Sequence, residues 1–273
     1  MTNAHRMGRI EFLNVLPIYH AMESGLTPHG FDLVYAPPSS LNAMMERGEI
    51  TVSSTSCIEY ARRPERYWVI PNLSIASHGT VLSVLLVSRV PVEKLEGKTV
   101  LLTAESHTSV ALVKMLLREY ARVSVNFVTG NASERMREAN APEAMLVIGD
   151  EALRLRNHPE YTYVWDLGEE WMRWTKHPFV FGLWVASKTA AFTEDPANAL
   201  HASRDWGVEN RADIIAIAEK RYGMSREFLE EYFTCLRYEL GDAEREGLRL
   251  FYDRLASSGE IAKAPELAFW PGI

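Results

Sequence analysis

The chain has 273 residues, which is enough for one large or two smaller domains with a substantial hydrophobic core. Hydrophobic residues make up 47% of the sequence and charged residues 24%, which is typical of a globular protein and argues against a disordered or fibrous chain. The formal net charge of −7 argues against a nucleic-acid-binding surface, because such surfaces are basic, but it does not exclude a local site for a small anion.

Strand and helix patterns alternate along the chain up to about residue 190, and helical patterns follow. We expect strands over residues 9–15, 31–36, 50–53, 67–71, 81–88, 98–102, 123–128, 144–148, 161–165 and 180–186. We expect helices over residues 17–23, 39–48, 91–97, 108–121, 132–139, 196–221, 225–236 and 242–255, with another beginning at Gly149. This alternation predicts an α/β protein whose sheets are largely parallel.

Two long apolar strands, residues 81–88 and 180–186, bracket a segment that looks self-contained. If both strands cross between lobes, the chain leaves a first lobe, builds a second and returns. We therefore expect lobe one to contain residues 1–87 and 188–273, and lobe two residues 88–187. Such a chain would form a two-lobed clamp with a cleft at the hinge.

Hydroxyl side chains follow two of the predicted strands, directly before a helix. One group is Ser54, Thr55 and Ser56, and the other contains Ser106, His107, Thr108 and Ser109. A helix start offers unpaired backbone N–H groups and the positive end of the helix dipole, which together suit a carboxylate or phosphate. Plain helix capping is the alternative. Because ligands of open α/β folds lie at the carboxyl ends of strands, we expect both groups to face one anionic ligand.

The cysteine content and the hydropathy bear on the cellular compartment. Cys57 and Cys235 show neither a disulfide framework nor metal-ligand spacing, which favours a reducing compartment. No apolar stretch approaches 18 residues, and the first residues lack the apolar core of a signal peptide. We therefore expect a cytoplasmic protein without a membrane span.

Several sequence blocks, in this order, resemble the chorismate dehydratases of the futalosine route to menaquinone. The blocks are Arg9-Ile-Glu-Phe-Leu-Asn-Val-Leu-Pro17, Leu73-Ser-Ile-Ala-Ser-His-Gly-Thr-Val-Leu-Ser-Val-Leu-Leu-Val-Ser88, Ala104-Glu-Ser-His-Thr-Ser-Val-Ala-Leu112, Leu146-Val-Ile-Gly-Asp-Glu-Ala-Leu153, Asp166-Leu-Gly-Glu-Glu-Trp-Met-Arg-Trp174 and His177-Pro-Phe-Val-Phe-Gly-Leu-Trp-Val185. The resemblance covers most of the chain up to about residue 187, and the helical C-terminal part carries little of it.

The resemblance implies a two-lobed, periplasmic-binding-protein-like (type II) α/β fold with two crossover hinge strands. It also implies a carbon–oxygen lyase that removes water from chorismate to give 3-[(1-carboxyvinyl)oxy]benzoate. No redox cofactor is implied, because loss of the hydroxyl and of a ring proton makes the ring aromatic. No metal is implied either.

The resemblance assigns Asn14 as a catalytic or substrate-orienting residue and Ser83 as a second catalytic candidate. A carboxamide can hydrogen-bond a departing hydroxyl but cannot titrate, and Asn14 could instead serve a turn. Ser83 could instead bond to nearby backbone. The two carboxylates of chorismate suit the two clusters of hydroxyl-bearing residues described above, one for each carboxylate. Gly149 and Asp150 complete the expected substrate-binding set, although Asp150 could simply favour the start of a helix.

The proton acceptor stays open. The protein candidates are His78, His107, His177, Asp150 and Glu105. The alternative is the enolpyruvyl carboxylate of the substrate itself, in a site that positions more than it titrates. His78, Leu82 and His107 stand where the family often has a basic residue, and a histidine is only partly charged at neutral pH.

Two other functions fit the same fold. One is a non-enzymatic solute-binding module, since a fold does not set a function. The other is the sister enzyme of the same pathway, dihydroxynaphthoate synthase, which the opening at residues 13–17 disfavours. In each reading the partner is a small molecule, and the oligomeric state is left open.

Overall fold

The computed structural model describes residues 5–138 and 140–273, and contacts within the chain divide it into two compact units. Unit 1 contains the chain up to Ala76 and again from Val180 onward, and unit 2 is Ser77–Phe179. The chain therefore passes from unit 1 to unit 2 and back once, and each unit has its own sheet.

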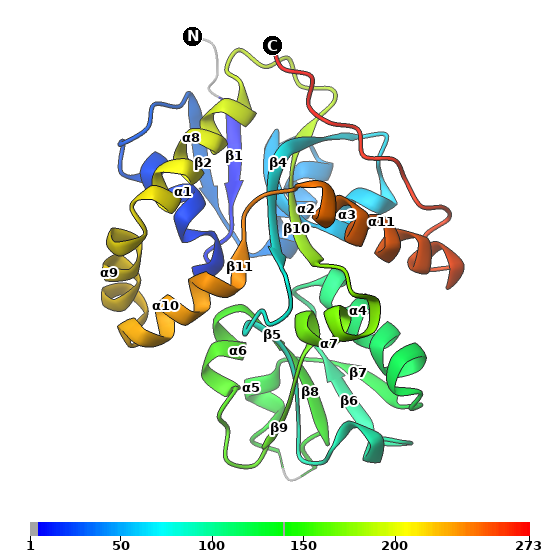
Figure 1. Cartoon of the computed structure of the whole chain (residues 1–273). Coiled ribbons are helices and arrows are strands. Elements are labelled where there is room, and N and C mark those ends of the chain that lie inside the picture. Colours follow the sequence, from blue (N-terminus) through cyan, green and yellow to red (C-terminus); the bar gives the residue numbers. More distant parts are fainter. Residues whose placement is uncertain (1–4, 139) are drawn as a thin grey trace. The chain divides into compact units, whose positions relative to one another are not determined.

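Unit 1 is built on a six-stranded mixed sheet with the order β11-β4-β10-β3-β1-β2 (Figure 1). β1 pairs in parallel with β2 and β3, while β10 runs antiparallel beside β3. The strands are β1 (His5–Arg9), β2 (Phe31–Tyr35), β3 (Val52–Ser56), β4 (Tyr67–Ser77), β10 (Phe179–Ser187) and β11 (Leu236–Arg237).

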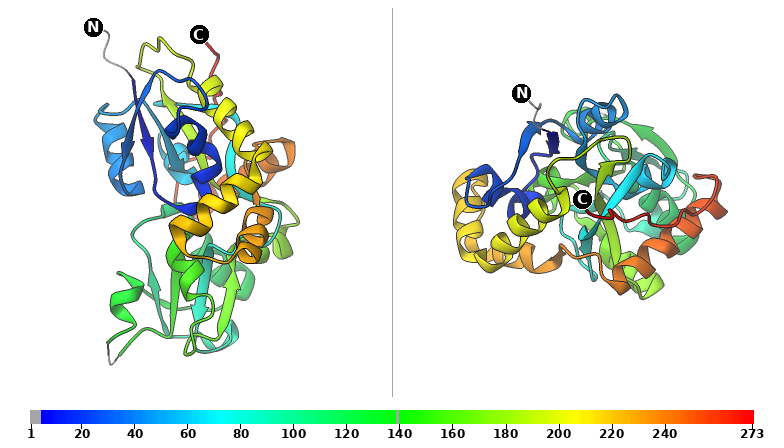
Figure 2. Two further views of the ribbon diagram at one scale, coloured as in Figure 1. Left: turned by 90° about the vertical axis from the view of Figure 1, so that its left-hand side faces the viewer. Right: turned by 90° about the horizontal axis from the view of Figure 1, so that it is seen from above.

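The helices of unit 1 come from both segments of the chain. They are η1 (Leu13–Val15), α1 (Leu16–Glu23), α2 (Pro38–Glu46), α3 (Cys57–Arg62), α8 (Pro196–Glu209), α9 (Arg211–Tyr222), α10 (Arg226–Cys235) and α11 (Asp242–Ser257). α1 and α8 lie side by side (Figure 2). A Cβ atom at Gly207 would lie 2.0 Å from the carbonyl oxygen of Pro17, so glycine is what allows α8 to approach the start of α1 this closely.

Unit 2 is built on a five-stranded sheet with the order β7-β6-β8-β5-β9. β6 pairs in parallel with β7 and β8, while β5 runs antiparallel beside β8 and β9. The elements are β5 (Val84–Ser88), η2 (Val92–Lys94), β6 (Thr99–Leu102), α4 (His107–Met115), η3 (Leu116–Ala121), β7 (Asn126–Thr129), α5 (Ala132–Arg135), β8 (Ala144–Ile148), α6 (Gly149–Leu155), β9 (Tyr163–Asp166) and α7 (Leu167–Thr175).

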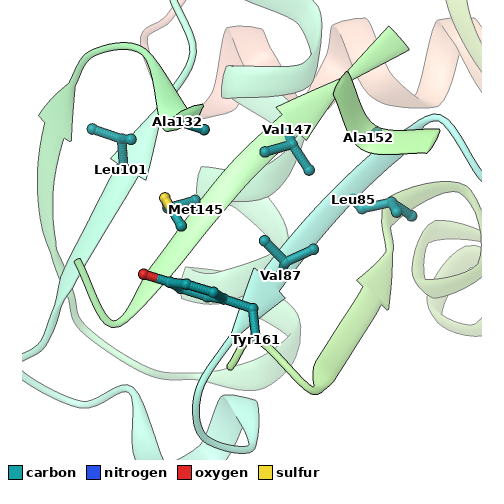
Figure 3. Close-up of a cluster of buried hydrophobic side chains, with 8 residues drawn as sticks. All are labelled: Leu85, Val87, Leu101, Ala132, Met145, Val147, Ala152 and Tyr161. Carbon is teal, nitrogen blue, oxygen red and sulfur yellow. The ribbon is translucent and has the colours of Figure 1, made fainter. Parts of the chain in front are cut away.

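A cluster of buried side chains from β5, β6 and β8 packs unit 2 together (Figure 3). Leu85 and Val87 are two residues apart on β5, and Met145 and Val147 have the same spacing on β8, so each pair points to one face of the sheet. Tyr161 closes the cluster, and its hydroxyl donates to the carbonyl of Pro142 at 2.9 Å. All eight side chains of this cluster belong to unit 2.

Several predicted boundaries shift in the structure. The expected strand over residues 9–15 is wrong: the parallel pairing of β1 ends at Arg9, and the chain turns into η1. The strand expected over residues 81–88 begins only at Val84, and the helix expected over residues 196–221 is divided into α8 and α9 at Asn210. The predicted helix 132–139 ends at Arg135, and Ala139 lies outside the described residues.

The expected boundaries of the two lobes also shift. The crossings lie at Ala76/Ser77 and Phe179/Val180, earlier in the chain than residues 87/88 and 187/188. β5 pairs along its whole length with β8, which makes it part of unit 2. β10 pairs with β3 from Gly182 to Ala186, which makes it part of unit 1. Backbone pairing, and not the length of an apolar run, decides which unit receives each strand.

None of the described helices is both long enough and apolar enough to span a membrane.

Candidate active site

Asn14 lies in η1, just beyond the carboxyl end of β1 in unit 1. Its Oδ1 atom is buried and has no hydrogen-bond partner among the described residues. Buried polar side-chain atoms are normally paired, so an unpartnered amide oxygen is a candidate contact for a ligand or a water molecule. This observation favours the functional interpretation of Asn14 over the turn-forming one, because its Oδ1 bonds no local backbone.

The guanidinium of Arg9 anchors the segment that leads to Asn14. Arg9 is fully buried, its Nε donates to Glu23 Oε1 at 2.7 Å, and its Nη1 donates to the carbonyl of Ile10. Its Cζ also lies 5.6 Å from the centre of the Tyr19 ring. These contacts tie the end of β1 to α1 and so hold the start of the loop before η1 in place.

Ser54, also in unit 1, is the second predicted site residue whose polar atom is unpaired. Its hydroxyl is buried and has no hydrogen-bond partner within the described part of the chain. Tyr19 lies beside it, where its own hydroxyl donates to the carbonyl of Gly8 at 2.9 Å and accepts from Trp184 Nε1 at 2.8 Å. Burial raises the pKa of Tyr19 to about 12, so this phenol stays protonated near neutral pH.

Ser54, Thr55 and Ser56 form the end of β3, and Ser56 is the N-cap position of α3, so these hydroxyl residues lie directly before a helix as expected. β3 does not end at Ser53 but continues to Ser56, because β10 supplies backbone partners as far as Gly182 opposite Ser56. Successive side chains of a strand point to opposite faces, and the Thr55 hydroxyl donates to Asn42 Oδ1 at 3.0 Å. Ser54 and Ser56 therefore share one face of the sheet, and Thr55 points to the other.

In unit 2, the second cluster of hydroxyl-bearing residues lies at the start of α4 as predicted. Ser106 caps the helix: its Oγ accepts from the backbone N–H of Ser109 at 3.2 Å and lies 2.9 Å from Ser109 Oγ. Thr108 and Ser109 are buried, while His107 is exposed. The cap uses one of the helix's terminal N–H groups, so both capping and the positive end of the α4 dipole are present here.

Ser83 and Gly149 lie side by side at the same end of the unit 2 sheet. β5 begins at Val84 opposite Ile148, and the N–H of Gly149 donates to the carbonyl of Ser83 at 2.8 Å. Gly149 has a φ of 55°, a left-handed conformation that favours glycine. Because β6 and β8 are parallel, the turns after both strands meet at one edge of this sheet, which brings the α4 start and the Ser83–Gly149 contact to the same edge.

Asp166 is a further residue of this region and is not among the predicted site residues. Its carboxylate accepts from the backbone N–H groups of Val81 and Leu82, at 2.7 Å for the shortest bond, and also caps α7 through Gly168 and Glu169. Leu82 has a φ of 61°, which is costly for a leucine, and directly precedes Ser83. The one available signal was an aspartate directly before a helix start.

Burial raises the pKa of Asp166, and the N–H groups of Leu82, Glu169 and Val81 oppose that shift. A carboxylate that is largely buried thus fixes the backbone next to Ser83. The Ser83 hydroxyl itself is buried and donates only a long hydrogen bond, 3.4 Å, to the carbonyl of Val81.

The candidate proton acceptors are distributed over unit 2. His78 and His107 are exposed, and His177 is partly buried. Burial raises the pKa of Glu105, and the nearby Glu151 raises it further. Asp150 lies in the first turn of α6. Among the described residues, no group of three or more His, Cys, Asp or Glu side chains is placed to hold a metal ion.

Two α/β units, one interrupted by the other and each with polar residues at the carboxyl ends of its strands, define the fold class of the periplasmic binding proteins. A crystal structure from Archaeoglobus fulgidus matches with a TM-score of 0.78 at 17% identity, covering 96% of this chain and 100% of that one. The periplasmic aliphatic sulphonate binding protein of Escherichia coli matches with a TM-score of 0.66 at 15% identity, covering 100% of this chain and 94% of that one.

Within that class, the chain belongs to the menaquinone biosynthesis family, whose sequence profile matches residues 5–257. A chorismate dehydratase from Thermus thermophilus is 29% identical to it over 268 residues, covering 91% of this chain and 94% of that relative. The match extends well into the C-terminal helices, beyond the part of the chain in which the sequence blocks occur.

Proposed function

We propose that this protein is a chorismate dehydratase, a hydro-lyase that converts chorismate into 3-[(1-carboxyvinyl)oxy]benzoate. The observation that carries the proposal is the similarity to the Thermus thermophilus enzyme over nearly the whole length of both chains. The unpartnered Oδ1 of Asn14, inside the opening motif on which the resemblance rests, supports it from the structure.

The proposed reaction is an elimination with a balanced set of changes. A proton leaves a ring carbon, its C–H electron pair forms the new ring double bond, and the C–O bond to the hydroxyl breaks. The departing hydroxide takes up one proton, which balances the proton released from the ring, and leaves as water, so no oxidant or reductant is consumed. We propose that the substrate's enolpyruvyl carboxylate accepts the ring proton, which leaves the protein the task of positioning.

We assign catalytic roles to Asn14 of unit 1 and to Ser83 of unit 2. The Asn14 carboxamide can accept the substrate's hydroxyl proton in a hydrogen bond through its unpartnered Oδ1 and can donate through its N–H, and the Ser83 hydroxyl can also donate. Neither side chain needs to titrate near neutral pH. Hydrogen bonds fix the segment that contains each residue. The contacts of Arg9 fix the segment before Asn14, and the Asp166 carboxylate fixes the backbone before Ser83. Such preorganised donors are effective because they need no reorganisation during the reaction.

We assign the carboxylates of the substrate to the remaining polar residues. In unit 2 these are Ser106, His107, Thr108 and Ser109 at the α4 start, together with Gly149 and Asp150. In unit 1, Ser54 and Ser56 share one face of β3, and Ser54 Oγ has no partner among the described residues. Thr55 is left out because its hydroxyl is bonded to Asn42.

The test is to incubate the purified protein with chorismate and to follow the product by absorbance and mass. Loss of one water with formation of the carboxyvinyloxy-benzoate is the expected result. Binding without turnover would favour the solute-binding module instead. If chorismate is neither bound nor turned over, the proposal is contradicted. The sister substrate, cyclic dehypoxanthine futalosine, is then the next compound to assay.

A further inference from the structure

Unit 1 contains a pocket of about 230 Å³ that includes none of the predicted site residues. Its lining includes residues of α8, α9, α10 and β11, together with Pro17 at the start of α1. Figure 1 labels these elements. Three of its lining side chains are arginines: Arg204 from α8, Arg211 from α9 and Arg237 from β11. The lining thus combines three cations from separate elements in one depression.

The arginines differ in how fully they are bonded. Arg204 is occupied, because it pairs with Asp205 at 2.7 Å and donates to the carbonyl of Asn72 at 2.6 Å. Arg211 uses only Nη2, on the Glu230 carbonyl and the Thr234 hydroxyl, and Arg237 uses only Nη1. Within the described residues, Nε and the other terminal nitrogen of both Arg211 and Arg237 form no hydrogen bond. These guanidinium groups keep donors for an acidic ligand.

Tyr238 adds an independent observation at the same pocket. This lining residue is 9% exposed, and its hydroxyl is a buried atom with no hydrogen-bond partner among the described residues. Burial holds the pKa of this phenol well above its ordinary value, and Arg211 opposes the shift, so the hydroxyl remains a donor near neutral pH. A buried donor without an acceptor is costly, and a ligand oxygen would remove that cost.

The rest of the lining is apolar. Phe233, Ile214 and Leu236 line the pocket together with Val208, which is 54% exposed and therefore presents apolar surface to solvent. The lining acids are Asp205, which Arg204 already pairs, and Glu239. One end of an occupant would therefore meet cationic and hydroxyl donors, and its body would meet hydrocarbon.

We propose that this pocket is a second ligand site, for a small carboxylate with a ring-sized apolar body. The carboxylate contacts Arg211, Arg237 and the Tyr238 hydroxyl, and the apolar body packs on Phe233 and its neighbours. Small-molecule sites commonly combine a mostly apolar wall with a few convergent polar groups in this way.

The pocket is also placed to influence the candidate active site. Pro17 lines it and opens α1, which directly follows η1 with Asn14. An occupant therefore contacts the helix that continues from the Asn14 segment. This regulatory consequence rests on the proposed function, whereas binding to the pocket does not.

The experiment is a titration of the full chain with 4-fluorobenzoate, observed by fluorine NMR in the absence of chorismate. We expect saturable binding with a dissociation constant below about 1 mM, and at least about tenfold weaker binding of the neutral 4-fluorobenzyl alcohol. Arg237→Gln should weaken 4-fluorobenzoate binding about tenfold, since it removes the charge. Arg249→Gln, an exposed arginine of α11 outside the pocket, should leave it unchanged.

Tyr238→Phe is the sharper variant, because the deleted hydroxyl has no partner among the described residues and its loss leaves the packing intact. It should weaken the binding of 4-fluorobenzoate several-fold without lowering the melting temperature of the unliganded protein. Absence of saturable binding, or binding that both Arg237→Gln and Tyr238→Phe leave unaltered, would overturn the proposal. Binding that is lost in Asn14→Ala or Ser106→Ala instead would place the probe in the candidate active site and overturn it as well.

Discussion

At the scale of single residues, the structure separates polar groups that are already satisfied from those that are not. Thr55 looked equivalent to Ser54 in the sequence, yet its hydroxyl is bonded to Asn42 while the Ser54 hydroxyl has no partner within the described residues. Asn14 Oδ1 belongs to the second kind. Unsatisfied buried groups destabilise a fold, so their presence in a functional motif is best explained by a ligand that pairs with them.

Replacing Asn14 by alanine should therefore affect turnover far more than stability. We expect turnover of chorismate to fall at least about a hundredfold, because a preorganised donor is lost. The free energy of unfolding should change by less than about 1 kcal/mol, since no internal bond of Oδ1 is broken. Asn42→Ala, which removes a bonded carboxamide from the same unit, is the control and should keep most of the activity. Equal turnover in both variants would contradict the role of Asn14.

Asp166→Asn should reduce both stability and turnover. An amide offers one acceptor oxygen where the carboxylate offers two, and its NH₂ group would face backbone N–H groups. We expect a loss of about 2–3 kcal/mol in the free energy of unfolding, measured by denaturant titration. The control is Asp195→Ala, because Asp195 Oδ1 caps α8 through Ala197 and Asn198 in unit 1 and alanine removes that acceptor. It should lose stability and keep turnover, and a similar loss of turnover in both variants would refute a positioning role for Asp166.

At the scale of the secondary-structure elements, a helix start is both a structural and a binding device. Ser106 caps α4 and Ser225 caps α10, and each side-chain oxygen accepts from the N–H three residues later. A local pattern predicts both caps equally well. Only their position differs, because α4 follows the carboxyl end of β6 at the edge where Ser83 and Gly149 meet, whereas Ser225 follows the helix α9.

The pair of caps provides a matched test. Ser106→Ala and Ser225→Ala should each cost about 1 kcal/mol of unfolding free energy, measured by thermal or denaturant unfolding. Only Ser106→Ala should also weaken the binding of chorismate. We expect this as a several-fold rise in KM in the product assay. Unchanged KM in Ser106→Ala would show that this serine is a cap and nothing more.

At the scale of the whole molecule, the two units differ in how the chain builds them. Unit 2 is continuous, and its sheet and buried cluster come from one segment. Unit 1 is discontinuous, because β10 enters its sheet between β4 and β3 only after unit 2 is complete. The long connection between β3 and β10 makes the pairing of unit 1 costly in loop-closure entropy until unit 2 brings the ends together.

A fragment spanning residues 77–179 should therefore fold by itself. We expect α/β circular dichroism and a cooperative thermal transition, since its hydrophobic cluster is complete (Figure 3). A fragment of residues 1–76 should stay unfolded in the same measurements, because it lacks the strand that lies between β3 and β4. An unfolded 77–179 fragment would show that unit 2 depends on unit 1.

The sequence by itself determined the alternation of strands and helices, the insertion of one unit into the other and the cap at Ser106, and its resemblance to a family is what proposes Asn14 and Ser83 as catalytic residues. Periodicity and helix-start chemistry are local and can be read along the chain. The tertiary structure decided the length of β3 and the two positions at which the chain passes between the units. It also decided that the Asp166 carboxylate bonds the backbone before Ser83. It also decided which hydroxyls and amides have partners, because pairing and burial depend on residues that are distant in sequence and close only in the fold.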